Sequence, residues 1–129
     1  MNRIGRVLLF LLAFAALAAG CRIAPIYNVT EAPVVSNKPV STADVEKAIM
    51  RAGATLGWQM TAVKPGTVQG TLNLRTHQAI VDIPYTAKSY SILYKDSTNL
   101  DYNGREIHSN YNGWVQNLDK AIKAQLSNL

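Results

Sequence analysis

The chain has 129 residues, a formal net charge of +5 and a single cysteine, so it is long enough for one domain and cannot form an intrachain disulfide. Two basic residues, Arg3 and Arg6, belong to an N-terminal segment that we expect to be removed, which leaves a charge of about +3. The other Lys and Arg residues are scattered singly, without the basic run typical of nucleic-acid binding. We therefore expect no nucleic-acid partner.

The first 20 residues have the organisation of a secretory signal peptide. Arg3 and Arg6 form a short basic region, and an apolar run of about 13 residues follows from Val7 to Ala19. A helix that crosses a bilayer needs about 20 consecutive apolar residues, so this run is too short. We expect residues 1–20 to be cleaved rather than to span a membrane.

The sequence L-A-A-G-C at residues 17–21 resembles the bacterial lipobox, in which signal peptidase cuts before a cysteine that becomes acylated. The resemblance implies a lipoprotein anchored to the membrane through acyl chains, such as palmitate, on Cys21. Arg22 follows the cysteine, and similarity to enterobacterial sorting rules then favours the periplasmic face of the outer membrane. The alternative is an ordinary signal peptide that leaves Cys21 as a free thiol.

Residues 21–40 carry the cysteine and are expected to form a flexible linker, because prolines interrupt them and no helical period appears. Such a linker would let the domain at residues 41–129 stand away from the membrane. Two apolar pieces, Ile26 to Val29 and Val34-Val35, leave open the alternative that this segment pairs with the edge of a sheet.

A first helix is predicted to begin at Ser41 or Thr42 and to end at Gly57. Asp44 is placed to complete a capping box with Ser41, and apolar residues recur at helical spacing as far as Leu56. Gly53 inside this helix costs about 1 kcal/mol relative to Ala, which predicts close packing against another element.

Four strands follow, because an alternation of period two replaces the helical spacing from Trp58 onward. Short connections between them favour an antiparallel meander with one apolar and one polar face. A last helix is predicted from Ser109 to about Leu126, with an apolar stripe at steps of three and four residues. The predicted fold is α+β: a two-layer, four-stranded antiparallel meander with two helices packed on one face, in the order α-β-β-β-β-α.

Three stretches carry a further resemblance: Y-S-I-L-Y at residues 90–94, S-T-N-L-D-Y at 97–102, and I-H-S-N-Y-N-G-W at 107–114. Together they resemble a pattern in small bacterial envelope lipoproteins of unknown function. The resemblance spans most of the chain after Cys21 and implies this fold and a cell-envelope location. It implies no activity, substrate or catalytic residue.

No catalytic, phosphate-binding or metal motif stands out in the chain. His77 and His108 are the only histidines, and no two metal-ligating residues lie at ligand spacing on one element. His108 is expected to hydrogen-bond the backbone or Asp101 at the start of the last helix. We expect a protein that is not an enzyme and needs no cofactor or metal; the alternative is a weak hydrolase or metal site around His108.

Aromatic, asparagine and arginine residues gather between the last strand and the last helix. Most of the aromatic rings are expected to pack in the core, with a minority exposed for binding. The candidate binding surface consists of Arg75, Asn99, Tyr102, Arg105, His108 and Asn112. The predicted function is that of an interaction or accessory module with an envelope protein partner; the alternative is a binding protein for a small envelope ligand, such as a peptidoglycan fragment or a peptide.

Overall fold

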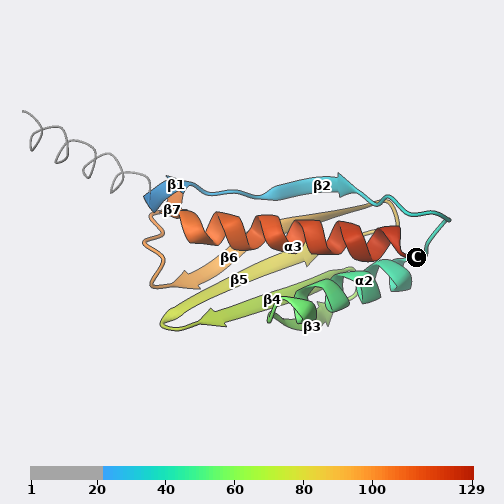
Figure 1. Ribbon diagram of the computed structural model, residues 1–129, viewed down its shortest axis with the longest axis horizontal. Coiled ribbons are helices and arrows are strands. Elements are labelled where there is room, and N and C mark those ends of the chain that lie inside the picture. The colour runs from blue at the N-terminus through green and yellow to red at the C-terminus, as the bar shows by residue number, and fades with distance from the viewer. Residues whose placement is uncertain (1–21) are drawn as a thin grey trace, which may run out of the picture.

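The computed structural model describes residues 22–129, so the predicted signal peptide and Cys21 lie outside the described residues. Within this range the fold is α+β, with two helices and an antiparallel sheet (Figure 1). The elements in chain order are β1 (Ile23–Pro25), β2 (Val29–Pro33), α2 (Thr42–Thr55), β3 (Gln59–Lys64), β4 (Thr67–Leu74), β5 (His77–Pro84), β6 (Ser89–Thr98), β7 (Glu106–His108) and α3 (Ser109–Ser127).

The predicted meander is present as β3, β4, β5 and β6, each paired antiparallel with the next. The prediction of exactly four strands is wrong in one respect, because the main sheet has five strands in the order β2-β6-β5-β4-β3. A separate two-stranded sheet joins β1 to β7, with Ile23 opposite His108. Of the three additional strands, β1 and β2 come from the segment that was expected to be a linker, and β7 lies directly before α3.

The flexible-linker prediction is therefore wrong for residues 23–33, where the alternative of pairing with a sheet edge holds. Strand β2 lies along β6, with Val29 opposite Ile92 and only 7% exposed. The register shifts between Val29 and Ala32, and at this bulge the amide of Glu31 donates to Ser91 Oγ at 2.8 Å. Burial of Val29 and the backbone hydrogen bonds stabilise this pairing. The prolines do not prevent it because they lie at strand ends, where they are tolerated.

Helix α2 starts as the sequence predicts. The Asp44 amide donates to Ser41 Oγ at 3.1 Å, and the Ser41 amide donates back to Asp44 Oδ2 at 3.0 Å, which completes the capping box. This backbone hydrogen bond lowers the pKa of Asp44. Gly53 faces β3, and a Cβ added there would lie 2.2 Å from Met60 Sδ, so the predicted close packing is confirmed.

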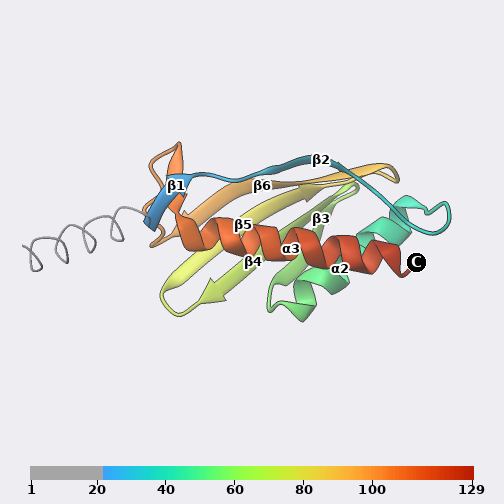
Figure 2. The same cartoon turned by 45° about the horizontal axis from the view of Figure 1, so that its top comes forward.

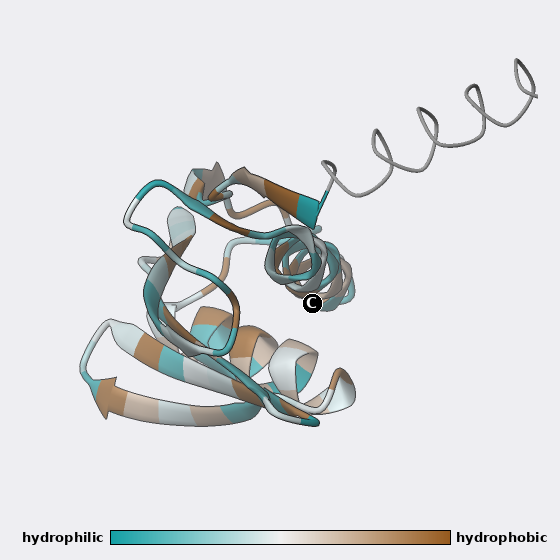
Figure 3. Cartoon of the chain, turned by 90° about the vertical axis from the view of Figure 1, so that its left-hand side faces the viewer, coloured by the Kyte–Doolittle hydropathy of each residue, from teal (hydrophilic) through white to brown (hydrophobic). Residues whose placement is uncertain are grey.

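Both helices cover the same face of the sheet, and their apolar stripes meet the inward side chains of the strands (Figure 2). Hydropathy alternates along the strands, as an amphipathic sheet requires (Figure 3). The core contains residues of every layer, among them Ile49, Val81, Ile92, Leu118 and Ile122, which are all fully buried. Within residues 22–129, no helix covers the opposite face of the sheet.

Candidate functional site

Most of the candidate binding residues lie at one end of the molecule. At this end the chain enters β1, and β7 leads into α3. The β4–β5 turn lies there beside the end of β6 (Figure 1). We call this surface the entry end. Its exposed residues are Arg22, Ile23, residues 73–76, Asn99 and residues 101–106.

Asn99 fixes the segment after β6 to the neighbouring turn. Its side-chain amide donates to Thr76 Oγ1 at 2.8 Å, and its carbonyl accepts from His77 Nδ1 at 2.6 Å. Asn99 and Arg75 both have positive φ, 57° and 56°, a conformation that asparagine tolerates better than most residues. The exposed Arg75 is thereby held beside the segment that carries Tyr102.

Three tyrosines connect the core to the surface of the entry end. Tyr111 is fully buried, Tyr94 is half-buried, and Tyr102 is 40% exposed. The Tyr94 ring lies edge-on to Tyr111, with centroids 5.7 Å apart, and packs against Tyr102 at 4.1 Å. Burial raises the pKa of Tyr94 and of Tyr111. The prediction that most aromatic rings pack in the core is confirmed for Tyr90, Tyr111 and Trp58, and Tyr102 supplies an exposed ring.

Arg105 lies in a turn that Asn103 closes. Asn103 Oδ1 accepts from the amides of Arg105 and Glu106, at 3.0 and 2.8 Å, and the Arg105 carbonyl accepts from the amide of Ile26 at 3.0 Å. The backbone is therefore fixed on both sides, while the guanidinium group is exposed beside a hollow that Pro25 also lines.

His108 and Asn112, by contrast, use their side chains within the fold. His108 caps α3 by accepting from the Asn110 amide at Nδ1, 3.2 Å away, and its own amide donates to the Leu100 carbonyl. Asn112 accepts from the Tyr27 amide and donates to the Pro25 carbonyl, both at 2.9 Å. The interpretation of His108 as a residue of the helix entry is confirmed, with the backbone as its partner.

The two histidines have separate surroundings. His77 bonds Asn99 and lies against Trp114, with ring centroids 6.4 Å apart, whereas His108 bonds Asn110. Across residues 22–129 no three His, Cys, Asp or Glu side chains are grouped as metal ligands.

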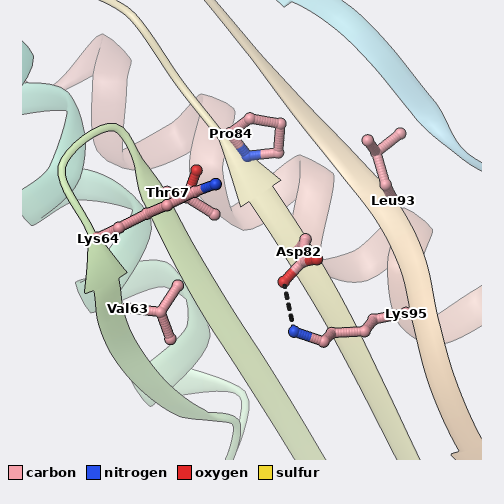
Figure 4. A pocket seen from close by; sticks show the side chains of 7 residues that line it. All are labelled: Val63, Lys64, Thr67, Asp82, Pro84, Leu93 and Lys95. Carbon is pink, nitrogen blue, oxygen red and sulfur yellow. Dashed lines mark ion pairs between the residues drawn. The ribbon is translucent and has the colours of Figure 1, made fainter.

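The outer face of the sheet has a hollow that the sequence did not reveal. Its volume is about 390 Å³, and it spans four strands, β3 to β6 (Figure 4). Lys95 Nζ lies 3.6 Å from Asp82 Oδ1 and donates to Gln69 Oε1 at 3.4 Å. The lining residues are Val63, Lys64, Thr67, Asp82, Pro84, Leu93 and Lys95.

The hollow combines apolar contact area with donors and one carboxylate. Val63 is 47% exposed, and Pro84 on β5 and Leu93 on β6 add apolar surface around the two lysines. The Lys95–Asp82 pair is partly exposed, so it contributes little to stability and can exchange partners readily. The convergence of Asp82, Leu93 and Lys95 depends on the register between the strands, which an alternation of period two does not define.

No described helix is long and apolar enough to cross a membrane. Comparisons with protein-family models, with curated proteins and with solved structures found no match to this chain.

Proposed function

We propose that this chain is a lipid-anchored lipoprotein of the bacterial cell envelope, held through Cys21 at the periplasmic face of the outer membrane. In this proposal it acts without catalysis, as an interaction or accessory module for an envelope protein. The lipobox-like sequence at residues 17–21 supports the anchor. The observation that carries the interaction role is the uncovered outer face of the sheet with its hollow.

The outer face suits a protein partner that presents apolar and acidic side chains. The side chains of Lys64 and Lys95 extend over the sheet between Val63 on β3 and Leu93 on β6, so a partner's carboxylates can meet the ammonium groups while its apolar groups cover the leucine and valine. The free edge of β3 is a weaker candidate for strand addition. Its register shifts between Ala62 and Lys64, and a bulge and an edge lysine are devices that discourage pairing with another strand.

Site-specific crosslinking in cells tests the protein partner. A photo-reactive amino acid at Leu93 should capture a defined envelope protein, while the same amino acid at Gln116, exposed on the outside of α3, should not. Lys95→Glu should abolish the Leu93 product because it reverses the charge that faces the partner. Equal products at Leu93 and Gln116, or a Leu93 product that Lys95→Glu leaves unchanged, would overturn this assignment of the surface.

The second candidate is a binding protein for a small envelope ligand such as a peptidoglycan fragment or a peptide. It is favoured by the size of the hollow, since ligand pockets occupy about 300–1,000 Å³, and by the paired Lys95 and Asp82, which match a ligand with both carboxylate and amine groups. Titration calorimetry of the purified protein with a muropeptide discriminates the two. Binding that is lost in Lys95→Gln and retained in Lys120→Gln would favour the small ligand.

A further inference from the structure

The chain leaves the folded domain with almost no free tether. Ile23 is already paired with His108, and the amide of Ile26 is bonded to the Arg105 carbonyl. A chain advances at most about 3.6 Å per residue, so the two residue steps that separate Ile23 from Cys21 can span no more than about 7 Å in any conformation. A lipid on Cys21 would therefore place the entry end at the bilayer surface, instead of letting the domain stand away from it.

The entry end differs in composition from the rest of the surface. It carries three of the four arginines among residues 22–129, namely Arg22, Arg75 and Arg105, while the described lysines all lie elsewhere. None of these three arginines forms an ion pair with another described residue. Arginine is suited to phosphate because its planar guanidinium group donates two parallel hydrogen bonds.

Exposed apolar and aromatic side chains accompany these arginines. Ile23 is 39% exposed, Leu74 46% and Tyr102 40%. Tyrosine is enriched where membranes meet water, because its ring is apolar and its hydroxyl group is polar. The face thus combines phosphate-binding donors with side chains that suit the boundary between headgroups and acyl chains.

We propose that the entry end is a membrane-contact face, on which Arg22, Arg75 and Arg105 bind headgroup phosphates of anionic phospholipids. This inference rests on the proposed acylation of Cys21. Asp101 and Glu106 lie on the same face, so its net charge is small, and the short tether, more than charge alone, brings the arginines to the phosphates. A bilayer is favoured over a protein partner because the anchor itself fixes the bilayer within reach.

The orientation has a consequence for the outer hollow. The long axis of the molecule runs away from the entry end, and the strand ends that carry Lys64, Thr67 and Pro84 lie toward the opposite end (Figure 1). A domain that stands on its entry end therefore keeps the hollow away from the lipid. The proposed partner surface stays accessible from the periplasm.

Labelled full-length protein in lipid nanodiscs tests the contact. An acylated Cys21 has no free thiol, so a fluorophore reacts only with an introduced cysteine: Glu106→Cys at the entry end, or Lys88→Cys at the opposite end. Nanodiscs that contain phosphatidylglycerol and a headgroup-attached quencher should quench the Glu106→Cys label several-fold more than the Lys88→Cys label. Equal quenching of the two labels would overturn the proposal.

A charge series then tests the arginines. Arg75→Gln combined with Arg105→Gln should reduce quenching of the Glu106→Cys label, while the matched control, Lys38→Gln with Lys47→Gln, should leave it unchanged. Quenching that the arginine changes leave intact would contradict phosphate binding. Self-quenching between labelled proteins that disappears on dilution in the discs would show instead that this face binds a second copy of the chain.

Failure of the anchor itself has a separate signature. Mass spectrometry of the mature N-terminus reports acylation of Cys21, and maleimide labelling of the wild-type protein reports a free thiol. An unmodified, reactive Cys21 would contradict the proposed function. An acylated Cys21 with equal quenching at both labels would contradict only the membrane-contact face.

Discussion

The hydroxyl group of Tyr90 donates a hydrogen bond to Asp119 Oδ1 at 2.5 Å inside the core, and this contact joins β6 to α3. Tyr90 is 1% exposed and Asp119 7% exposed, so both polar groups are withdrawn from water. Lys123 Nζ donates to the second carboxylate oxygen at 3.0 Å. A buried carboxylate is tolerated when its oxygens are occupied in this way, and the pair therefore fixes how α3 packs on the sheet.

Asp119→Ala is expected to destabilise the protein by about 2 kcal/mol, because it leaves the Tyr90 hydroxyl buried without its acceptor. Urea unfolding of the single variants and of Asp119→Ala combined with Tyr90→Phe gives the coupling energy. The double variant should be less destabilised than the sum of the single variants. If the destabilisation of the double variant equals the sum for the two single variants, the two groups do not depend on each other.

Tyr111→Phe is expected to behave in the opposite way. The Tyr111 hydroxyl is buried and has no hydrogen-bond partner among the described residues, whereas the ring is fully packed. An unsatisfied buried hydroxyl costs about 1–3 kcal/mol, so removing it should leave stability unchanged or increase it. Tyr90→Phe is the matched comparison and should destabilise. A clear loss of stability in Tyr111→Phe by thermal unfolding would reveal a partner for this hydroxyl.

Alkaline pH should lower stability. Burial raises the pKa of Tyr90 and Tyr111, and the hydrogen bond to Asp119 raises the pKa of Tyr90 further. Above about pH 10 the unfolded tyrosines lose protons that the folded ones keep, so each contributes a loss of up to about 1.4 kcal/mol per pH unit. The stabilising contribution is complete below the unfolded pKa and declines above it.

Thermal unfolding across the alkaline range measures this decline. Tyr90→Phe combined with Tyr111→Phe should flatten the fall in melting temperature above about pH 10, because the two raised pKa values are removed. The same slope in wild type and in the double variant would mean that other groups dominate alkaline unfolding.

The parts of the fold that the sequence predicted are those defined by local signals. The capping box joins Ser41 to Asp44, only three residues away, and the apolar stripe of the last helix recurs every three or four residues. Both helices begin where these local signals predict. Strand β2 has no such signal, because its place is defined by Ile92 and Ser91, about 60 residues further along the chain. Pairing of this kind depends on the edge that β6 offers, which local periodicity does not report.

The candidate sites divide in the same way. Asn99, Tyr102 and Arg105 were identifiable because they cluster in one stretch of sequence, and the structure places them at one end. His108 and Asn112 belong to the same stretch but bond the backbone of distant or adjacent residues, and side-chain direction is what separates them from the others. The outer hollow draws one or two residues from each of four strands, so no single stretch of sequence marks it.

Gly53→Ala is expected to leave stability nearly unchanged, although alanine favours a helix by about 1 kcal/mol. The new Cβ would lie 2.2 Å from Met60 Sδ and 2.5 Å from Met60 Cγ, so the methionine must move out of its place between α2 and β3. Because these atoms belong to a flexible, half-buried side chain, the cost of this movement is small and offsets the helix-propensity gain. Chemical denaturation measures the net change.

Met60→Ala is the control background for that variant. It removes the atoms that clash, so Gly53→Ala should stabilise Met60→Ala protein by about 1 kcal/mol, because only the helix-propensity gain remains. The same effect of Gly53→Ala in both backgrounds would contradict the contact. In that case the helix would require glycine for another reason.

Asn112→Ala is expected to release the start of the domain from α3. The Asn112 side chain accepts a hydrogen bond from the Tyr27 amide and donates one to the Pro25 carbonyl, both at 2.9 Å. These bonds attach the segment where β1 ends and β2 has not yet begun. Two partly exposed hydrogen bonds contribute about 1 kcal/mol together, so global stability should fall only slightly. Protection of the Tyr27 amide from hydrogen exchange should fall much more, because this amide loses its hydrogen-bond acceptor. Hydrogen exchange at Tyr27 should accelerate in Asn112→Ala and stay unchanged in Asn110→Ala, the control from the same helix; equal exchange in the two variants would show that the strands alone hold the segment.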